Sequence, residues 1–334
     1  MLYKIRLACK IDYESAYKKY AQKACGTMIS LGAKITRAVL KIYTYPYRKK
    51  HKSLSRSIKF SKKPYLPPKN YRYEVKNIDG TKIEILSPIE ENNSLYAIVQ
   101  FHGGGHTQAM NKMYRRVAER LCKSTGYPVY SIDYKTDSNL TYPSLHKECY
   151  AAYAKLLDCL LKEKRIIAIG DSFGANLMLS TCLKLRDKKI QLPCALISIS
   201  CYVDLAATGS SYKKNCYIDP LYSLTKRQNF ERHENFIRRK TPYCGLTSPY
   251  DAYLSPAYAE YQNFPNMLLQ CGDCETSESD SDMLYEKAIA ANVKVKLTKY
   301  NGMWHDFQYL TPFLKESKRA WKEISKFIKQ IALQ

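Results

Sequence analysis

One short stretch decides the fold that the sequence predicts: Ile166-Ile167-Ala168-Ile169-Gly170-Asp171-Ser172-Phe173-Gly174-Ala175. Its first four residues are apolar and mostly β-branched, which is typical of a buried strand. The residues after it favour a helix, so Ser172 falls at the turn between the two elements. Gly170 and Gly174 stand two residues on either side of the serine, where a Cβ atom would strike the strand or the helix. This G-x-S-x-G pattern predicts a nucleophilic serine at the tip of a sharp strand-to-helix turn, and an ordinary glycine-rich turn is the alternative.

Strands and helices alternate on both sides of this stretch. We expect strands at 71–78, 81–86, 95–101, 127–134, 166–170, 194–200, 267–271 and 293–298, and helices at 113–125, 144–162, 175–188, 282–291 and 313–332. Asp79-Gly80 between the first two strands is a hairpin signal. Such alternation predicts an α/β fold with a mostly parallel sheet covered by helices on both faces.

The distribution of charge divides the chain near residue 70. The 334 residues suffice for one large domain with an attachment, or for two domains. Residues 1–70 carry +16 of the formal net charge of +24, and Asp12 and Glu14 are their only acids. The proline-rich stretch 63–69 is therefore the expected linker between a basic N-terminal segment, 1–70, and a domain at 71–334.

The N-terminal segment has helical patterning, with basic residues between apolar positions that include Met28, Leu31, Ile35, Val39 and Ile42. Three roles are open. The segment could be a cap or lid that docks its apolar face on the domain and leaves its basic face to solvent. It could lie on an anionic membrane surface, or bind nucleic acid. We favour the lid, and because no nucleic-acid-binding motif is found we expect no nucleic-acid partner.

The cysteines favour free thiols. Twelve are scattered along the chain, and only Cys271 and Cys274 are closely spaced. A single pair does not predict a zinc site, and disulfides are rare in a reducing cytoplasm. No signal peptide and no run of roughly 18 apolar residues is found. We therefore expect a cytoplasmic protein, peripheral to the membrane if residues 1–70 bind lipid.

A nucleophilic serine needs a general base, and the oxyanion that it forms needs hydrogen-bond donors. The sequence His102-Gly103-Gly104-Gly105 follows a predicted strand, and its glycines allow backbone N–H groups to point into a site. The expected oxyanion donors are the N–H groups of Gly103, Gly104 and Phe173, the last following the nucleophile. A phosphate-binding loop is the alternative, but the stretch lacks the Gly-Lys-Ser/Thr ending of a P-loop.

The base and the acid are expected late in the chain, because their order in this type of fold is serine, acid, histidine. Of six histidines, only His305 follows the last predicted strand. Asp273, Glu275 and Asp280 follow the preceding strand and are all candidates for the acid. Periodicity does not choose among them, and a helix-capping acidic loop is the structural alternative.

Over about residues 75–325 the chain resembles the hormone-sensitive-lipase-like branch of the α/β-hydrolase esterases. The resemblance is carried by the segments 102–105 (HGGG), 170–174 (GDSFG), 302–307 (GMWHDF), 203–205, 210–212, 219–220 and 254–256. It implies an α/β-hydrolase fold with an eight-stranded, mostly parallel sheet and an N-terminal helical cap. Matching the family's G-S-D-E-x-L-x-S-D-S loop onto residues 272–281 puts Glu275 at the catalytic acid.

Two departures from the family concern the substrate. Phe173 stands where the family usually has alanine, and residues 134–139 replace its usual Y-R-L-A-P-E. The sequence predicts a serine hydrolase of small-molecule carboxylic esters, either a short-chain acyl esterase or lipase-like, with Ser172, His305 and Glu275 as its triad and no metal or organic cofactor. An amidase or peptidase is the enzyme alternative. A catalytically silent membrane-surface or binding protein is the other.

Overall fold

A computed structural model of the chain describes residues 29–49, 65–90, 94–225 and 242–334. The helical pattern expected before residue 29 lies outside these residues. The strands are β1 (Tyr71–Ile78), β2 (Thr81–Pro88), β3 (Tyr96–Phe101), β4 (Val129–Asp133), β5 (Arg165–Asp171), β6 (Ala195–Ile199), β7 (Asn266–Gly272) and β8 (Val295–Tyr300). Each predicted strand is confirmed, with ends that differ by up to two residues.

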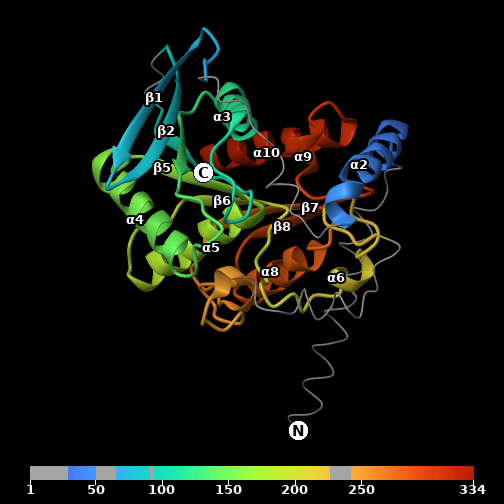
Figure 1. The fold of residues 1–334 in the computed structure, drawn as a ribbon. Coiled ribbons are helices and arrows are strands. Elements are labelled where there is room, and N and C mark those ends of the chain that lie inside the picture. Colours follow the sequence, from blue (N-terminus) through green and yellow to red (C-terminus); the bar gives the residue numbers. More distant parts are fainter. Residues whose placement is uncertain (1–28, 50–64, 91–93, 226–241) are drawn as a thin grey trace.

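One eight-stranded sheet forms the centre of the domain (Figure 1). Its strand order is β1-β2-β4-β3-β5-β6-β7-β8. β2 runs antiparallel to both β1 and β4, and all the other neighbours are parallel. The β1–β2 hairpin turns at Asp79 and Gly80, which both have positive φ, as a tight two-residue turn requires. The predicted α/β-hydrolase architecture is confirmed.

Helices cover both faces of the sheet. They are α2 (Leu31–Lys49), α3 (Lys112–Thr125), α4 (Ser144–Cys159), α5 (Ser172–Asp187), α6 (Ser211–Lys214), α8 (Glu278–Ala290), α9 (Phe307–Leu310) and α10 (Lys315–Ala332), with short 3₁₀ turns at Pro242–Cys244 and Pro256–Tyr258. α4, α5 and α8 pack into one apolar core, and α3 and α10 pack into a second core on the opposite face. α3 ends at Gly126, whose φ of 74° provides the left-handed C-cap.

α2 lies beside α9 (Figure 1) and against the loops at the carboxyl ends of β7 and β8. Ser30, which precedes it, donates to the Glu316 carboxylate, and the Arg37 guanidinium donates to Cys274 Sγ. The face of α2 that contacts the domain carries Ala33, Leu40 and Thr44.

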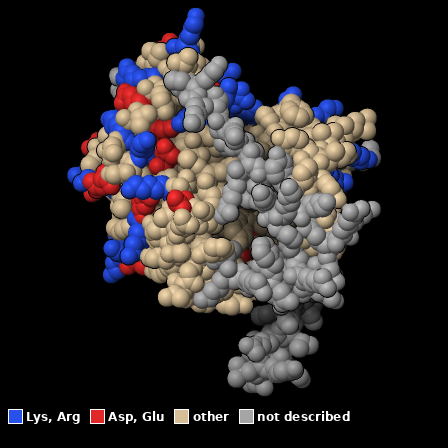
Figure 2. Space-filling view, viewed as in Figure 1, with Lys and Arg blue, Asp and Glu red and all other residues tan. Residues whose placement is uncertain are grey.

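The expected orientation of α2 is wrong. Leu31, Ile35, Val39 and Ile42 were expected to dock on the domain, but they form an outward stripe with exposed fractions of 55–76%. The domain instead receives the opposite face of α2, which carries Ala33, Leu40 and Thr44. Figure 2 shows basic but no acidic side chains over α2. α2 therefore presents an apolar and basic outer surface.

No helix within the described ranges has the length and apolar character needed to cross a membrane. The ten cysteines in the described part of the chain are free thiols, and nine of them are buried or half-buried.

Candidate active site

The nucleophile turn joins β5 to α5 without an intervening loop. Ser172 has a φ of 50°, a left-handed conformation that costs a residue with a side chain roughly 1–3 kcal/mol. The turn is tight, because a Cβ atom on Gly170 would lie 2.7 Å from the carbonyl oxygen of Gly174. A Cβ atom on Gly174 would overlap the carbonyl oxygens at the end of β3. Glycine at both positions therefore lets the strained serine project from the carboxyl edge of the sheet.

His305 meets Ser172 at this edge. The Nε2 atom of His305 lies 2.8 Å from Ser172 Oγ, a hydrogen-bond distance between a nucleophile and its base. Both side chains are buried, with exposed fractions of 4% and 8%. His305 comes from the loop between β8 and α9, so 133 residues separate two side chains that the fold brings into contact.

Glu275 lies on the other side of the imidazole. Its Oε2 atom is 3.4 Å from His305 Nδ1. Its Oε1 atom accepts hydrogen bonds from the Ser200 hydroxyl (2.7 Å) and the Gly272 N–H (2.5 Å). Burial raises the pKa of Glu275, while His305, the Gly272 N–H and Ser200 oppose this rise because they favour the carboxylate. These contacts hold the carboxyl group beside the imidazole.

The other two acid candidates have different partners. Asp273 Oδ1 accepts from the Gly302 N–H at 2.7 Å. Asp280 Oδ2 accepts from the N–H groups of Val203 and Asp204 at 2.9 and 3.0 Å. Asp273 therefore ties the histidine loop to the end of β7, and Asp280 holds the chain after β6. Of the three candidates, Glu275 is the one beside His305.

A further carboxyl group, Asp306, was not singled out from the sequence. Its Oδ2 atom lies 3.4 Å from His305 Nε2, and its own φ is 53°. Burial alone lowers the pKa of His305, but the carboxyl groups of Asp306 and Glu275 outweigh burial and raise it. Burial also raises the pKa of Asp306 to about 7, against the effect of His305. The sequence offered one indication of this contact, because Asp306 directly follows His305, the predicted base.

Comparisons with known proteins show the family to which the chain belongs. A family model described as the alpha/beta hydrolase fold matches residues 98–309. An esterase of Acinetobacter venetianus is 32% identical over 236 residues, covering 71% of this chain and 75% of the relative. This chain belongs to the α/β-hydrolase family.

Further relatives place this hydrolase in the hormone-sensitive-lipase-like branch. An acetyl-hydrolase of Streptomyces hygroscopicus is 26% identical over 232 residues, covering 70% of this chain and 75% of the relative. The crystal structure of an esterase from the bacterial hormone-sensitive lipase family is 26% identical, with a TM-score of 0.71 and coverage of 91% and 99% of the two chains. The resemblance seen in the sequence is confirmed.

The glycine loop of the hydrolase lies next to Ser172, but one expected donor is engaged. The Gly103 N–H donates to Asp171 Oδ1 at 3.0 Å, so it is not free to bind an oxyanion. The Gly104, Gly105 and Phe173 N–H groups have no acceptor among the residues that the structure describes. Phe173 lies in the first turn of α5, where backbone N–H groups have no partner within the helix. The expectation for Gly103 is therefore wrong, whereas Gly104 and Phe173 stay available.

The ring of Phe173 packs among other aromatic side chains in the interior. It is 2% exposed and meets the Tyr243 ring edge-on, with centroids 5.2 Å apart. His146 lies behind it and contacts the Tyr243 hydroxyl through Nδ1 (2.8 Å) and Asn176 Oδ1 through Nε2 (3.0 Å). Burial lowers the pKa of His146 to about 4. The neutral His146 thus supports the wall that receives Phe173, a role that sequence reasoning missed.

Tyr222 was also missed from the sequence. Its ring stands perpendicular to that of His305, with centroids 5.0 Å apart, and it is 49% exposed. Tyr222 therefore connects the base to the molecular surface.

No group of residues that could hold a metal ion is present in the described part of the chain.

Proposed function

We propose that this hydrolase cleaves carboxylic esters of small molecules with Ser172 as nucleophile, His305 as general base and Glu275 as the acid that orients the imidazole. Ser172 Oγ attacks the acyl carbonyl carbon while His305 Nε2 takes its proton. His305 then returns that proton to the alcohol as it leaves. Water deacylates the serine by the same route, and the acid product is released.

The 2.8 Å contact between Ser172 Oγ and His305 Nε2 carries this proposal. It joins a strained serine to a buried imidazole, as nucleophilic catalysis requires. The N–H groups of Gly104, Gly105 and Phe173 are the proposed oxyanion donors. Phe173 follows the serine, the glycine loop contacts Asp171 just before it, and the three N–H groups lack acceptors among the described residues. No step in this reaction calls for a metal or an organic cofactor.

Covalent labelling with diethyl p-nitrophenyl phosphate tests the proposal. The expected result is the release of one equivalent of p-nitrophenolate and a diethyl phosphate adduct on the peptide that contains Ser172. The His305→Ala variant should react at least ~10²-fold more slowly, because it lacks the base. Labelling at another residue, or equal rates in the two proteins, would refute the assignment.

The two alternatives from the sequence make different predictions. An amidase or peptidase would cleave p-nitroanilides as readily as the matching p-nitrophenyl esters, and a silent binding protein would cleave neither. The esterase relatives favour ester over amide hydrolysis, and the contact between Ser172 and His305 favours a catalytic protein over a silent one. The cytoplasmic location expected from the cysteines stays a prediction.

The proposal assigns residues 1–70 to a cap whose outer surface meets an anionic lipid surface. α2 lies against the loops that carry Cys274 and His305, which supports a cap at the active-site edge. The outward stripe of Leu31, Ile35, Val39 and Ile42, beside basic residues, supports contact with lipid. The two roles use opposite faces of α2 and are compatible.

A further inference from the structure

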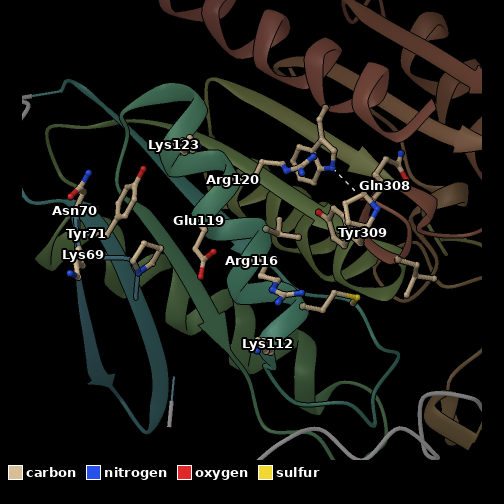
Figure 3. Close-up of a pocket in the computed structure, with 16 residues that line it drawn as sticks. Lys69, Asn70, Tyr71, Lys112, Arg116, Glu119, Arg120, Lys123, Gln308 and Tyr309 are labelled. Carbon is tan, nitrogen blue, oxygen red and sulfur yellow. Dashed lines mark hydrogen bonds between the residues drawn. The ribbon is translucent and has the colours of Figure 1, made fainter. Parts of the chain in front are cut away.

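A separate groove lies between α3 and the C-terminal helices (Figure 3), and Ser172, His305 and Glu275 are not among its lining residues. Its volume is about 980 Å³, in the range of small-molecule sites. α3 forms one wall, the residues before and at the start of β1 form the rim, and α9 and α10 form the other wall. Nothing in the proposed hydrolysis uses this groove.

Cations dominate the groove. Lys112, Arg116, Arg120 and Lys123 follow one another at steps of four and three residues, so they share one face of α3. At 1.5 Å per residue this basic stripe is roughly 16 Å long. Lys69 adds a fifth cation from the rim.

The described residues provide no carboxylate partner for these five cations. None forms an ion pair or a hydrogen bond within the part of the chain that the structure describes. Glu119 is the one acid among the described residues that line the groove, and its carboxylate accepts a hydrogen bond from the Tyr65 hydroxyl at 2.7 Å. The groove therefore holds a strong positive potential that its own residues do not neutralise.

The floor of the groove is apolar and aromatic. The Trp321 ring stacks on that of Tyr309 with centroids 5.6 Å apart, and Met113 and Val117 lie beside them. Figure 3 shows Arg120 reaching from α3 across the groove, and its guanidinium lies 5.1 Å from the centre of the Trp321 ring. Burial lowers the pKa of Arg120, and no carboxylate opposes that effect. The Tyr309 hydroxyl is buried without a hydrogen-bond partner in the described residues.

We propose that this groove binds an anionic amphiphile, a single alkyl chain that ends in a carboxylate or phosphate head group. The chain would lie on the aromatic and aliphatic floor, which gains from the removal of apolar surface from water. The head group would pair with Arg116 and Arg120, whose planar guanidinium groups suit both anions. The proposal does not depend on ester hydrolysis.

Charge excludes the nearest alternative occupants. Residues 50–64 of the chain contain six basic residues and no acid, and a second copy carries the same formal net charge of +24. A nucleic acid is a polyanion without an alkyl chain, so it would pair with the cations but leave the apolar floor of the groove uncovered. An amphiphile satisfies both the cations and the apolar floor.

Calorimetry with decyl phosphate and decanoate, each below its micellar concentration, tests the proposal. Both should bind, whereas inorganic phosphate and decanol, which each lack one half of the ligand, should bind at least tenfold more weakly. Arg116→Gln with Arg120→Gln should weaken binding of decyl phosphate at least tenfold. Lys155→Gln with Lys162→Gln removes two exposed cations from the region of α4, and should change binding less than twofold.

Tryptophan fluorescence locates the bound chain, because the protein contains two tryptophans. The probe 11-bromoundecanoate should quench the fluorescence of Trp321. It should not quench the fluorescence of Trp304, which is fully buried next to His305. Quenching should persist in Trp304→Phe and vanish in Trp321→Phe. Equal binding by the two double variants, heparin binding as tight as decyl phosphate, or quenching that persists in Trp321→Phe would overturn the proposal.

Discussion

Individual side chains around His305 set the protonation state on which the proposed base depends. Asp306 contacts Nε2, the atom that must accept the serine proton, whereas Glu275 contacts Nδ1. Both raise the pKa of His305 against the effect of burial. The free enzyme becomes active as His305 loses its proton, so a raised pKa moves the acidic limb of the activity profile to higher pH.

The Asp306→Asn variant tests this effect. Without the carboxylate, the pKa of His305 should fall, and the acidic limb of kcat/KM against pH should move to lower pH. The exposed Asp137→Asn variant is the control and should leave the limb in place. A limb that stays in place in Asp306→Asn, or moves to higher pH, would show that Asp306 does not act on the base.

The identity of the acid is a second question at this scale. Glu275→Gln should lower kcat at least ~10²-fold with a nearly unchanged melting temperature, because it removes the group that orients the imidazole. Asp280→Asn should lower the melting temperature and change kcat little, since Asp280 accepts hydrogen bonds from the Val203 and Asp204 N–H groups rather than contacting His305. Steady-state kinetics and thermal unfolding measure both. Loss of kcat in folded Asp280→Asn, with Glu275→Gln unimpaired, would move the assignment.

Among the elements, the turn from β5 to α5 leaves no room for an added side chain at its glycines. Gly174→Ala should lower the free energy of unfolding by roughly 3 kcal/mol or more, because its Cβ atom would overlap the end of β3. Gly32→Ala in α2 is the matched control. Its Cβ atom would lie 3.6 Å from Leu314, so removing a helical glycine should raise that free energy by about 0.5–1 kcal/mol. Denaturant unfolding of both variants measures these values, and a stable Gly174→Ala would refute the close packing.

The element that sequence reasoning oriented wrongly is α2. Ile35→Gln with Ile42→Gln should change the free energy of unfolding by less than ~1 kcal/mol, because both side chains face outward. The same double variant should lose binding to anionic vesicles, and binding of the unsubstituted protein should weaken with salt. Ala33→Gln, on the buried face, should lower the melting temperature. Strong destabilisation by the outer pair would show that another part of the chain covers it.

At the scale of the whole molecule, the fold and part of the site could be predicted from the sequence. The alternation of strands and helices predicted the sheet, because strands buried on both faces have continuous apolar sequences. The glycines around Ser172 predicted the turn between β5 and α5. His305 was predictable from its order in the chain. The engagement of Gly103 by Asp171, the contact of Asp306 with His305 and the groove beside α3 depend on tertiary contacts. The spacing of apolar residues identified the apolar stripe of α2, but it could not tell which face of the helix packs against the domain.

The turnover of a short-chain p-nitrophenyl ester by the Ser172→Ala variant tests the central claim most directly. We predict that kcat falls at least ~10³-fold relative to the unsubstituted protein, and that Ser172→Ala with His305→Ala is no worse than either single variant, because a triad acts as a unit. The variant should keep its melting temperature. Turnover by folded Ser172→Ala close to that of the unsubstituted protein would contradict the account.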